Sequence, residues 1–296
     1  MATAKFTFAQ FKAEYPEDAA CLRAILQRRY GIADACPNCG VVGKLTRIEG
    51  RRAFACKEGC HIYPCAGTVF EHSSTPLTLW FHAMYLMTST RNGVAAKELE
   101  RQLGVTYKCA WRIGHQLREL MAARDKATTP PQLSGHVEID ETYVGGYRRK
   151  KHPTDRPTAG KTPVMGLIER GGSFKGHVLR DAKKPTLLTH IFKDVAFGAT
   201  ISTDTLAAYK NLKHHGYTHG AVRHERFEWT AGEFGTNRIE GFWAHLKNGI
   251  RSTHIHVSPQ HLQKYVNEFA YRYNNRQAPA EMFRLMLAQI SQPTSA

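Results

Sequence analysis

The sequence lacks any run of about 18 apolar residues, the length that a membrane-spanning helix needs. Its first ten residues lack the apolar core of a secretory signal peptide, and neither a lipidation motif nor a basic amphipathic helix is evident. There is also no internal repeat and no long low-complexity tract. We therefore expect a cytoplasmic protein with no membrane partner.

Acidic residues are few, since 25 Asp and Glu stand against 41 Lys and Arg, which gives a formal net charge of +16. An excess of this size in a folded protein favours a polyanionic partner, and nucleic acid fits best where membrane signals are missing. A merely solvated basic surface is the alternative. With 296 residues, the chain can form one large domain or two to three small ones.

The seven cysteines are an odd number and four of them form two close pairs, which favours a metal over a disulfide framework. Thiolates at such spacings bind one tetrahedral Zn²⁺, and a closed site of this kind stabilises a fold without doing chemistry. The expected ligands are Cys36, Cys39, Cys56 and Cys60. The second pair is one residue wider than usual, so His61 and Cys65 compete for the fourth position. Ordinary buried cysteines are the alternative.

Composition divides the chain into four parts. We expect an N-terminal helical segment over 1–34 and a zinc ribbon over 35–72, a stretch too small for a core of its own. A helical region follows over 73–127, and a linker rich in Pro and Thr then leads to a mixed α/β domain over 135–285.

The segment Ala95–Ile113 has the pattern of a helix-turn-helix, with Gly104 at the turn and a second helix that begins near Thr106. In that arrangement one exposed face of the second helix would contact the major groove or phosphates of DNA. The residues of this face are Thr106, Tyr107, Lys108 and Arg112. A plain pair of antiparallel helices in a bundle is the alternative.

Hydrophobic patterning in the last domain predicts strands and helices in a mixed order. The expected strands are 136–140, 164–169, 177–179, 200–203 and 222–229, with a hairpin turn at Gly171 and Gly172. The expected helices are 206–212, 236–250 and 259–273.

Three acidic residues stand out by their places in this pattern. Asp140 and Asp204 end or follow apolar strands, and Glu240 lies on a later helix, an arrangement typical of ribonuclease H-type enzymes. Converging carboxylates of this kind hold two Mg²⁺ ions against a phosphodiester. Lys247 lies seven residues, or two helical turns, beyond Glu240 and shares its face, where it can serve a phosphate. Taken singly, each of these charges also fits a helix cap, a turn or a solvated surface.

The motifs around these acids resemble those of bacterial insertion-sequence transposases of the DDE type that have an N-terminal zinc ribbon. They are Asp140-Glu-Thr-Tyr-Val-Gly-Gly146, Thr236-Asn-Arg-Ile-Glu-Gly-Phe-Trp243, Leu246-Lys-Asn-Gly-Ile250, His254-Ile-His-Val-Ser258 and Glu268-Phe-Ala-Tyr-Arg-Tyr-Asn-Asn-Arg276. The resemblance extends over nearly the whole chain. Departures are Ile255, which splits a tandem His pair, Gly235 in place of a usual His, and the wider second cysteine pair.

The resemblance implies an α/β, ribonuclease H-like catalytic domain with a mixed sheet. In it, Asp140, Asp204 and Glu240 would hold two Mg²⁺ or Mn²⁺ ions, and Lys247 would contact DNA at the transposon end. Asn237 and His224 become weaker candidates for supporting roles. It further implies binding of terminal inverted repeats, strand cleavage and strand transfer, assembly as a dimer or higher oligomer on double-stranded DNA, and a place with the bacterial nucleoid.

Two other functions remain as alternatives at this stage: a zinc-ribbon and helix-turn-helix regulator without catalysis, and a ribonuclease H-like nuclease without strand transfer. The three acids argue against the regulator, since a protein that only binds DNA has no need of clustered negative charge. The N-terminal binding modules argue against the simple nuclease. The terminal repeat, the target preference and the processing of the second strand are not encoded in any motif.

Overall fold

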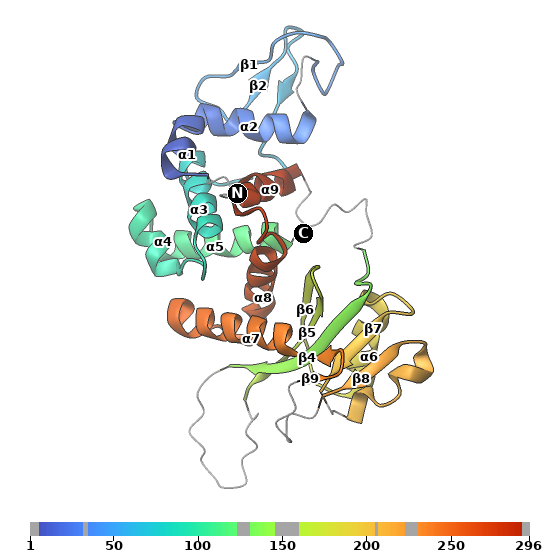
Figure 1. The fold of residues 1–296 in the computed structure, drawn as a ribbon. Helices are drawn as coiled ribbons and strands as arrows, with labels where there is room; N and C mark the ends of the chain where they lie inside the picture. The colour runs from blue at the N-terminus through green and yellow to red at the C-terminus, as the bar shows by residue number, and fades with distance from the viewer. Residues whose placement is uncertain are drawn as a thin grey trace. The chain divides into compact units, whose positions relative to one another are not determined.

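The computed structural model describes residues 6–31, 35–122, 131–145, 160–204, 207–222 and 230–291 (Figure 1). The chain forms two compact units, of which one comprises 1–128 with 277–296 and the other comprises 129–276. No helix among the described residues is both long and apolar enough to cross a membrane.

The first unit combines a small ribbon with a helical bundle. Its helices are α1 (Phe8–Glu14), α2 (Asp18–Tyr30), α3 (Leu77–Ser89), α4 (Ala96–Leu103), α5 (Tyr107–Ala122) and α9 (Met282–Ala288). Its antiparallel strands, in the order β1-β2-β3, are Thr46–Arg47, Phe54–Ala55 and His61–Ile62. Asp18 begins α2 and also caps α3, because its carboxylate accepts hydrogen bonds from the backbone N–H groups of Leu77 (3.0 Å) and Thr78 (2.9 Å).

The second unit is built on a five-stranded sheet in the order β6-β5-β4-β7-β8. The strands are β4 (His136–Val144), β5 (Thr162–Glu169), β6 (Phe174–Val178), β7 (Thr200–Thr203) and β8 (Thr218–Ala221). Strands β4, β5 and β6 form an antiparallel meander, whereas β7 and β8 run parallel to β4. This mixed sheet, with its first strand in the centre, has the ribonuclease H-like order.

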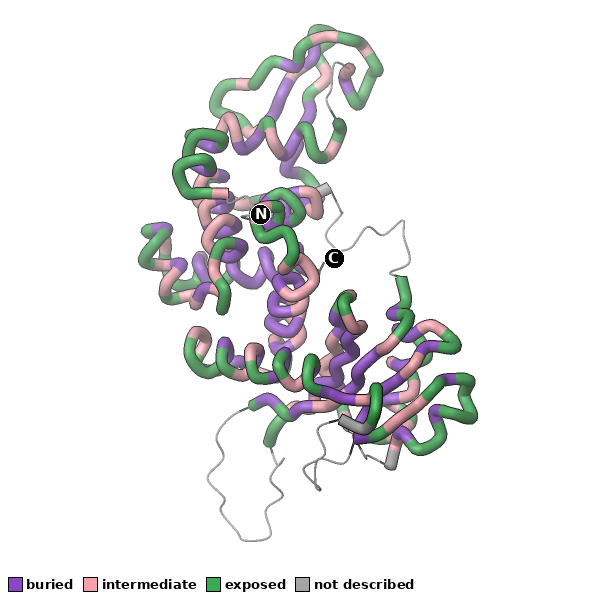
Figure 2. Tube along the Cα trace, viewed as in Figure 1, coloured by how far each residue is buried: buried purple, intermediate pink, exposed green. Residues whose placement is uncertain are grey.

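Helices cover both faces of this sheet. Helix α6 (Lys184–Asp194) packs on one face, where its buried residues join a core with Val137 and Ile139 of β4. Helices α7 (Asn237–Gly249) and α8 (Pro259–Asn274) pack on the other face, where Val144 belongs to their core. Alternation along β4 therefore turns its even-numbered residues toward α7 and α8, and Figure 2 shows this sheet largely buried.

Two expected elements differ from the structure. Two short 3-10 helices, η1 (Ala207–Tyr209) and η2 (Leu212–His215), replace the helix expected over 206–212. The fifth strand is β8, which ends where the strand expected over 222–229 would begin, and residues 223–229 lie outside the described part of the chain. The structure also contains α6 and α9, which the sequence pattern did not predict.

Candidate active site

The register of the sheet brings Asp140 and Asp204 together. Strands β4 and β7 run parallel with Glu138 opposite Ser202, so that two residues further along each chain are Asp140 and Asp204. The separation of 64 residues between the two acids (204 − 140) equals the register offset (202 − 138). Since neighbouring strands lie roughly 5 Å apart, Asp140 in the middle of β4 and Asp204 just beyond β7 come close to one another.

Helix α7 adds the third acid. Glu240 lies in its first turn, where Oε1 accepts a hydrogen bond of 2.9 Å from the hydroxyl of Thr236. Burial raises the pKa of Asp140 to about 6, and the charges of Asp204 and then Glu240 act in the same direction. The three acids therefore share one electrostatic environment. They are not among the groups of described residues whose ligand atoms all lie within 4.8 Å of one another, so the acids are near one another but not closed around a single point.

Trp243 holds the carboxylate of Asp140 in place. Its indole Nε1–H donates to Oδ2 of Asp140 at 3.0 Å, one turn of α7 beyond Glu240. Gly166 lies opposite Asp140 in the β4–β5 pair, and a Cβ there would come within 2.6 Å of the Trp243 ring. The absence of a side chain at this position therefore makes room for the indole.

Glu138 connects β4 directly to the start of α7. Its buried carboxylate accepts from the backbone N–H groups of Arg238 (2.9 Å) and Ile239 (3.3 Å), and it forms an ion pair of 2.9 Å with Arg170. The Arg170 guanidinium also donates to the carbonyl oxygens of Glu233 and Gly235. A negative charge at a helix N-terminus is stabilising, so Glu138 fixes the helix that contains Glu240 to the strand that contains Asp140.

A further carboxyl group, Glu141, follows Asp140 on β4 and was considered in the sequence only as part of a motif. The alternation of the strand turns its side chain to the opposite face of the sheet. Burial raises its pKa to about 9, with further contributions from the charges of Asp140 and then Asp204. Its Oε1 atom is buried without a hydrogen-bond partner in the described structure. Glu141 is therefore neutral at pH 7. The raised pKa that distinguishes Glu141 from an ordinary carboxyl group depends on its surroundings in the folded sheet, which no local sequence motif reveals.

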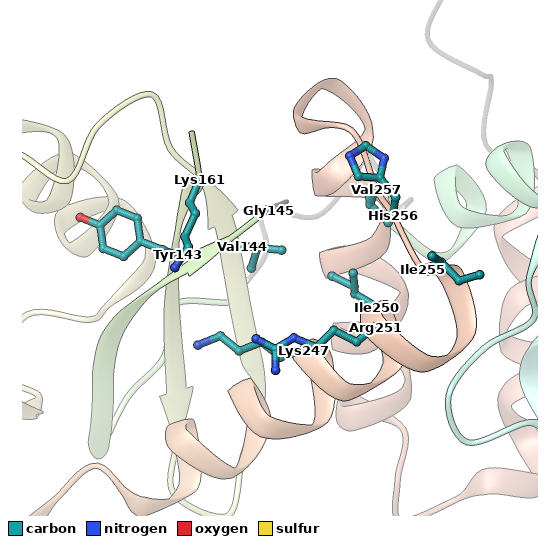
Figure 3. Close-up of a pocket in the computed structure, with 10 residues that line it drawn as sticks. All are labelled: Tyr143, Val144, Gly145, Lys161, Lys247, Ile250, Arg251, Ile255, His256 and Val257. Atoms are coloured by element: carbon teal, nitrogen blue, oxygen red, sulfur yellow. The ribbon is translucent and has the colours of Figure 1, made fainter. Parts of the chain in front are cut away.

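A basic pocket of about 420 Å³ lies at the end of β4 (Figure 3). Lys247 lines it from α7, Arg251 from the following π-helical turn (Ile250–His254), and Lys161 from the residue before β5. Burial lowers the pKa of Lys247, Asp140 acts in the opposite direction, and Arg251 and Lys161 lower it further. The pocket is thus an electrostatic neighbour of the acidic cluster.

In the ribbon, the Sγ atoms of four cysteines lie within 4.8 Å of one another. They are Cys36, Cys39, Cys56 and Cys60. Cys65 is buried outside this group and His61 is exposed, so the geometry favours Cys60 as the fourth member. Four converging thiols suit one tetrahedral Zn²⁺.

A second group that could bind a metal consists of His177, His190 and Asp194. Both oxygens of Asp194 already have partners, since Oδ1 pairs with Lys175 at 3.1 Å and Oδ2 with His177 at 2.8 Å. The buried Lys175 ammonium also opposes a second cation nearby. We therefore interpret this group as an ion-pair network between β6 and α6.

The expected DNA-binding segment forms two helices joined at Gly104, whose left-handed φ of 64° ends α4. The expected contact residues Thr106, Tyr107, Lys108 and Arg112 are all exposed at the start of α5. Arg112 donates to the hydroxyl of Ser73 at 3.2 Å and lies over the ring of Trp80, so the bundle fixes its position. Trp111 is a further exposed aromatic on this surface.

Asn237 is the first residue of α7 and is exposed beside the acidic cluster, whereas His224 lies outside the described residues.

Two family models match this chain. The ISXO2-like transposase domain matches residues 132–274, and the transposase zinc-ribbon domain matches residues 16–62. An uncharacterized protein in transposable element ISH50 of Halobacterium salinarum is 30% identical over 274 residues, which cover 86% of this chain and 89% of that protein. The chain belongs to the ISXO2-like transposases.

Two solved structures are also similar to this transposase at low identity. The Mos1 transposase paired-end complex with left transposon end has a TM-score of 0.30 at 13% identity, over 71% of this chain and 78% of that chain. The Mos1 strand transfer complex has a TM-score of 0.29 at 11% identity, with the same coverage. The ribonuclease H-like character of the transposase rests on its own strand order.

Proposed function

We propose that this transposase binds the terminal inverted repeats of its insertion sequence, cleaves a DNA strand and joins the freed 3′ end to target DNA. The observation that supports this most directly is the convergence of Asp140, Asp204 and Glu240, which come from two parallel strands and one helix. Assembly as a dimer or higher oligomer on paired ends, close to the bacterial nucleoid, belongs to the same proposal.

The acidic cluster fits divalent metal ions. Oxygen ligands suit Mg²⁺ or Mn²⁺, and a bound cation would stabilise the ionised form of Asp140, whose pKa is raised by burial and by the charges of Asp204 and Glu240. Asp140, Asp204 and Glu240 would hold two such ions, whose chemistry would be to activate the attacking water or 3′-hydroxyl and to stabilise the leaving oxygen. Trp243 orients Asp140 for this role.

The remaining functional residues would bind DNA or support the fold. Lys247 would contact a phosphate at the transposon end, and Asn237 a neighbouring group. The exposed face of α5 would bind the terminal repeat through Thr106, Tyr107, Lys108 and Arg112. One structural Zn²⁺ would be held by Cys36, Cys39, Cys56 and Cys60. The domain limits we propose are 1–34, 35–72, 73–127 and 135–285. Of the last range, the residues from 277 onward belong to the first compact unit.

Strand cleavage on duplexes from the ends of the element tests the catalytic part. We expect Asp140→Asn, Asp204→Asn and Glu240→Gln each to abolish nicking with Mg²⁺ while leaving binding to the duplex intact. Glu233→Gln, which alters an exposed acid in the same unit, is the matched control and should retain nicking. A triad variant that still nicks at the wild-type rate would remove that residue from the proposed site.

The same assay separates this function from its two alternatives. A wild-type protein that binds the ends but never cuts them would be a regulator, and one that cuts without joining would be a nuclease. Binding should also weaken steeply with added salt, because a protein of net charge +16 neutralises many phosphates.

A further inference from the structure

The pocket at the end of β4 is lined by basic groups on one side. Lys161, Lys247 and Arg251 line it together with His256, and none of its ten lining residues is acidic. Figure 3 shows Lys247 and Arg251 on the α7 side, with Lys161 across the opening. Three permanent cations within one opening favour an anionic ligand with more than one phosphate within reach.

The other side of the same pocket is apolar. Val144, Ile250 and Val257 line it, and all three also belong to the core formed by α7 and α8. Neither a free phosphate nor a sugar-phosphate backbone alone has an apolar surface that would pack against these residues. A nucleotide has both chemistries, since its phosphate is anionic and its base presents a flat, largely apolar face.

Ile255 stands at this pocket in a strained conformation. Its φ of 63° and ψ of −54°, with a 2.6 Å hydrogen bond from His256 N–H to the His254 carbonyl, define a γ-turn of the rare and strained type. A β-branched residue with positive φ is an outlier, and this one exposes 83% of its surface. It also follows a π-helical turn, a feature frequent at functional sites. Backbone strain of this kind persists where a site needs it.

We propose that this pocket binds one nucleotide of the DNA strand next to the cleaved bond, with its base outside the double helix. The phosphates contact Lys161, Lys247 and Arg251, and the base lies against the apolar wall. Ile255 packs against the base pair that the displaced nucleotide leaves. Lys247 interacts electrostatically with Asp140, which places the pocket beside the acids. The inference therefore rests on the strand cleavage that we propose for those acids.

Fluorescence of 2-aminopurine tests the displaced base, since this analogue brightens when it leaves the base stack. Duplexes from the ends of the element, with 2-aminopurine at successive positions around the cut, are mixed with the full-length Asp140→Asn protein. We expect a several-fold increase at one position only. The increase should disappear in a second protein that also has Arg251→Ala and Lys161→Ala. Lys193→Ala, an exposed lysine on α6 across the sheet, should leave it unchanged.

The strain at Ile255 allows a second test, in which one substitution should preserve or increase stability but reduce cleavage. Ile255→Gly relieves the backbone strain, so its melting temperature should rise or stay equal, while cleavage of paired duplex falls several-fold. A substrate with a mismatch or an abasic site at the displaced position should restore the lost cleavage, because little unstacking then remains. Phe197→Ala, which removes an equally exposed apolar side chain, should alter neither property.

Flat fluorescence at every position, or cleavage by Ile255→Gly that no mismatch restores, would overturn the proposal. These outcomes are distinct from failure of the proposed function. In that case the wild-type protein would not cleave the paired duplex at all.

Discussion

At the scale of single residues, Asp140 combines a functional placement with a cost in stability. Its pKa is raised to about 6, so the ionised form is less stable in the folded protein than in the unfolded chain. The resulting loss of stability is small below about pH 3, grows between the unfolded pKa of 3.8 and the folded pKa of about 6, and is complete above that range. At neutral pH the folded protein is therefore less stable than it would be with an uncharged group at this position, because the negative charge of Asp140 lies near other negative charges.

Asp140→Asn should accordingly raise the free energy of unfolding at pH 8 by on the order of 1 kcal/mol, although it abolishes cleavage. At about pH 3 the variant and the wild type should unfold nearly alike, because Asp140 is then mostly protonated in both states. Thermal unfolding at the two pH values, without divalent ions, measures the difference. Equal stabilities at pH 8 would contradict the repulsion that we infer at this site.

Local sequence indicated the three acids that we propose for catalysis, but not the residues that support them. Asp140, Asp204 and Glu240 each follow a recognisable strand or helix signal. Trp243 and Gly166 work as a pair across 77 residues (243 − 166), and only the β4–β5 register shows that the glycine lies opposite Asp140. A sequence pattern records the residue type at such positions and not the partner.

At the scale of elements, the attachment of α7 to β4 determines how far Glu240 lies from Asp140. Glu138 makes this attachment through two backbone N–H groups and the ion pair with Arg170. Its carboxylate is only 2% exposed, so removal of one partner leaves the others without compensation in the interior.

Glu138→Ala should therefore lower the free energy of unfolding by roughly 3 kcal/mol. In Glu138→Gln, which keeps one acceptor for the helix N-terminus, we expect a smaller loss of stability but a raised Mg²⁺ requirement for cleavage. Titration of cleavage against Mg²⁺ at saturating DNA separates these effects, and excess Mg²⁺ should restore the Gln variant. If the Gln variant had the wild-type Mg²⁺ requirement, Glu138 would be a purely structural residue.

The ribbon offers a matched pair of cysteines for the zinc proposal. Cys60 lies in the four-thiol group and Cys65 lies outside it, although both are close in sequence. Cys60→Ser should lose the bound zinc and destabilise the first unit, because a small ribbon depends on its metal. Cys65→Ser should retain one zinc per chain. Metal analysis of the two purified variants checks this, and the reverse result would assign the fourth position to Cys65.

Elements in which apolar residues do not recur at a regular helical or strand spacing were not predicted correctly from the sequence. Helix α6 buries only Leu187, Ile191 and Asp194, and Pro185 in its sequence suggests a break although proline is favoured in a first helical turn. Over 206–212 the apolar residues suggested a helix, yet the chain forms short 3-10 turns on the core beside β7. In both places tertiary packing decided the outcome, which local propensity does not contain.

At the scale of the whole molecule, the chain leaves its first unit near residue 128 and returns to it at residue 277. Helix α9 completes that unit, where Phe283 contacts the rings of Phe11, Tyr15 and Phe81. The residues proposed for catalysis all lie in the second unit, which is inserted between two parts of the first. The C-terminal segment therefore belongs to the core of the unit that contains the ribbon and α5.

Phe283→Ala should destabilise the first unit by about 3 kcal/mol or more, since this ring is buried among other aromatics. Leu285→Ala on the same helix removes a side chain that is 39% exposed and should cost much less. Hydrogen exchange read by peptide distinguishes the units. For Phe283→Ala, exchange should increase in α1, α2 and α3 while β4, β5 and α7 remain protected. Equal loss of protection in both sets would mean that the two units unfold as one.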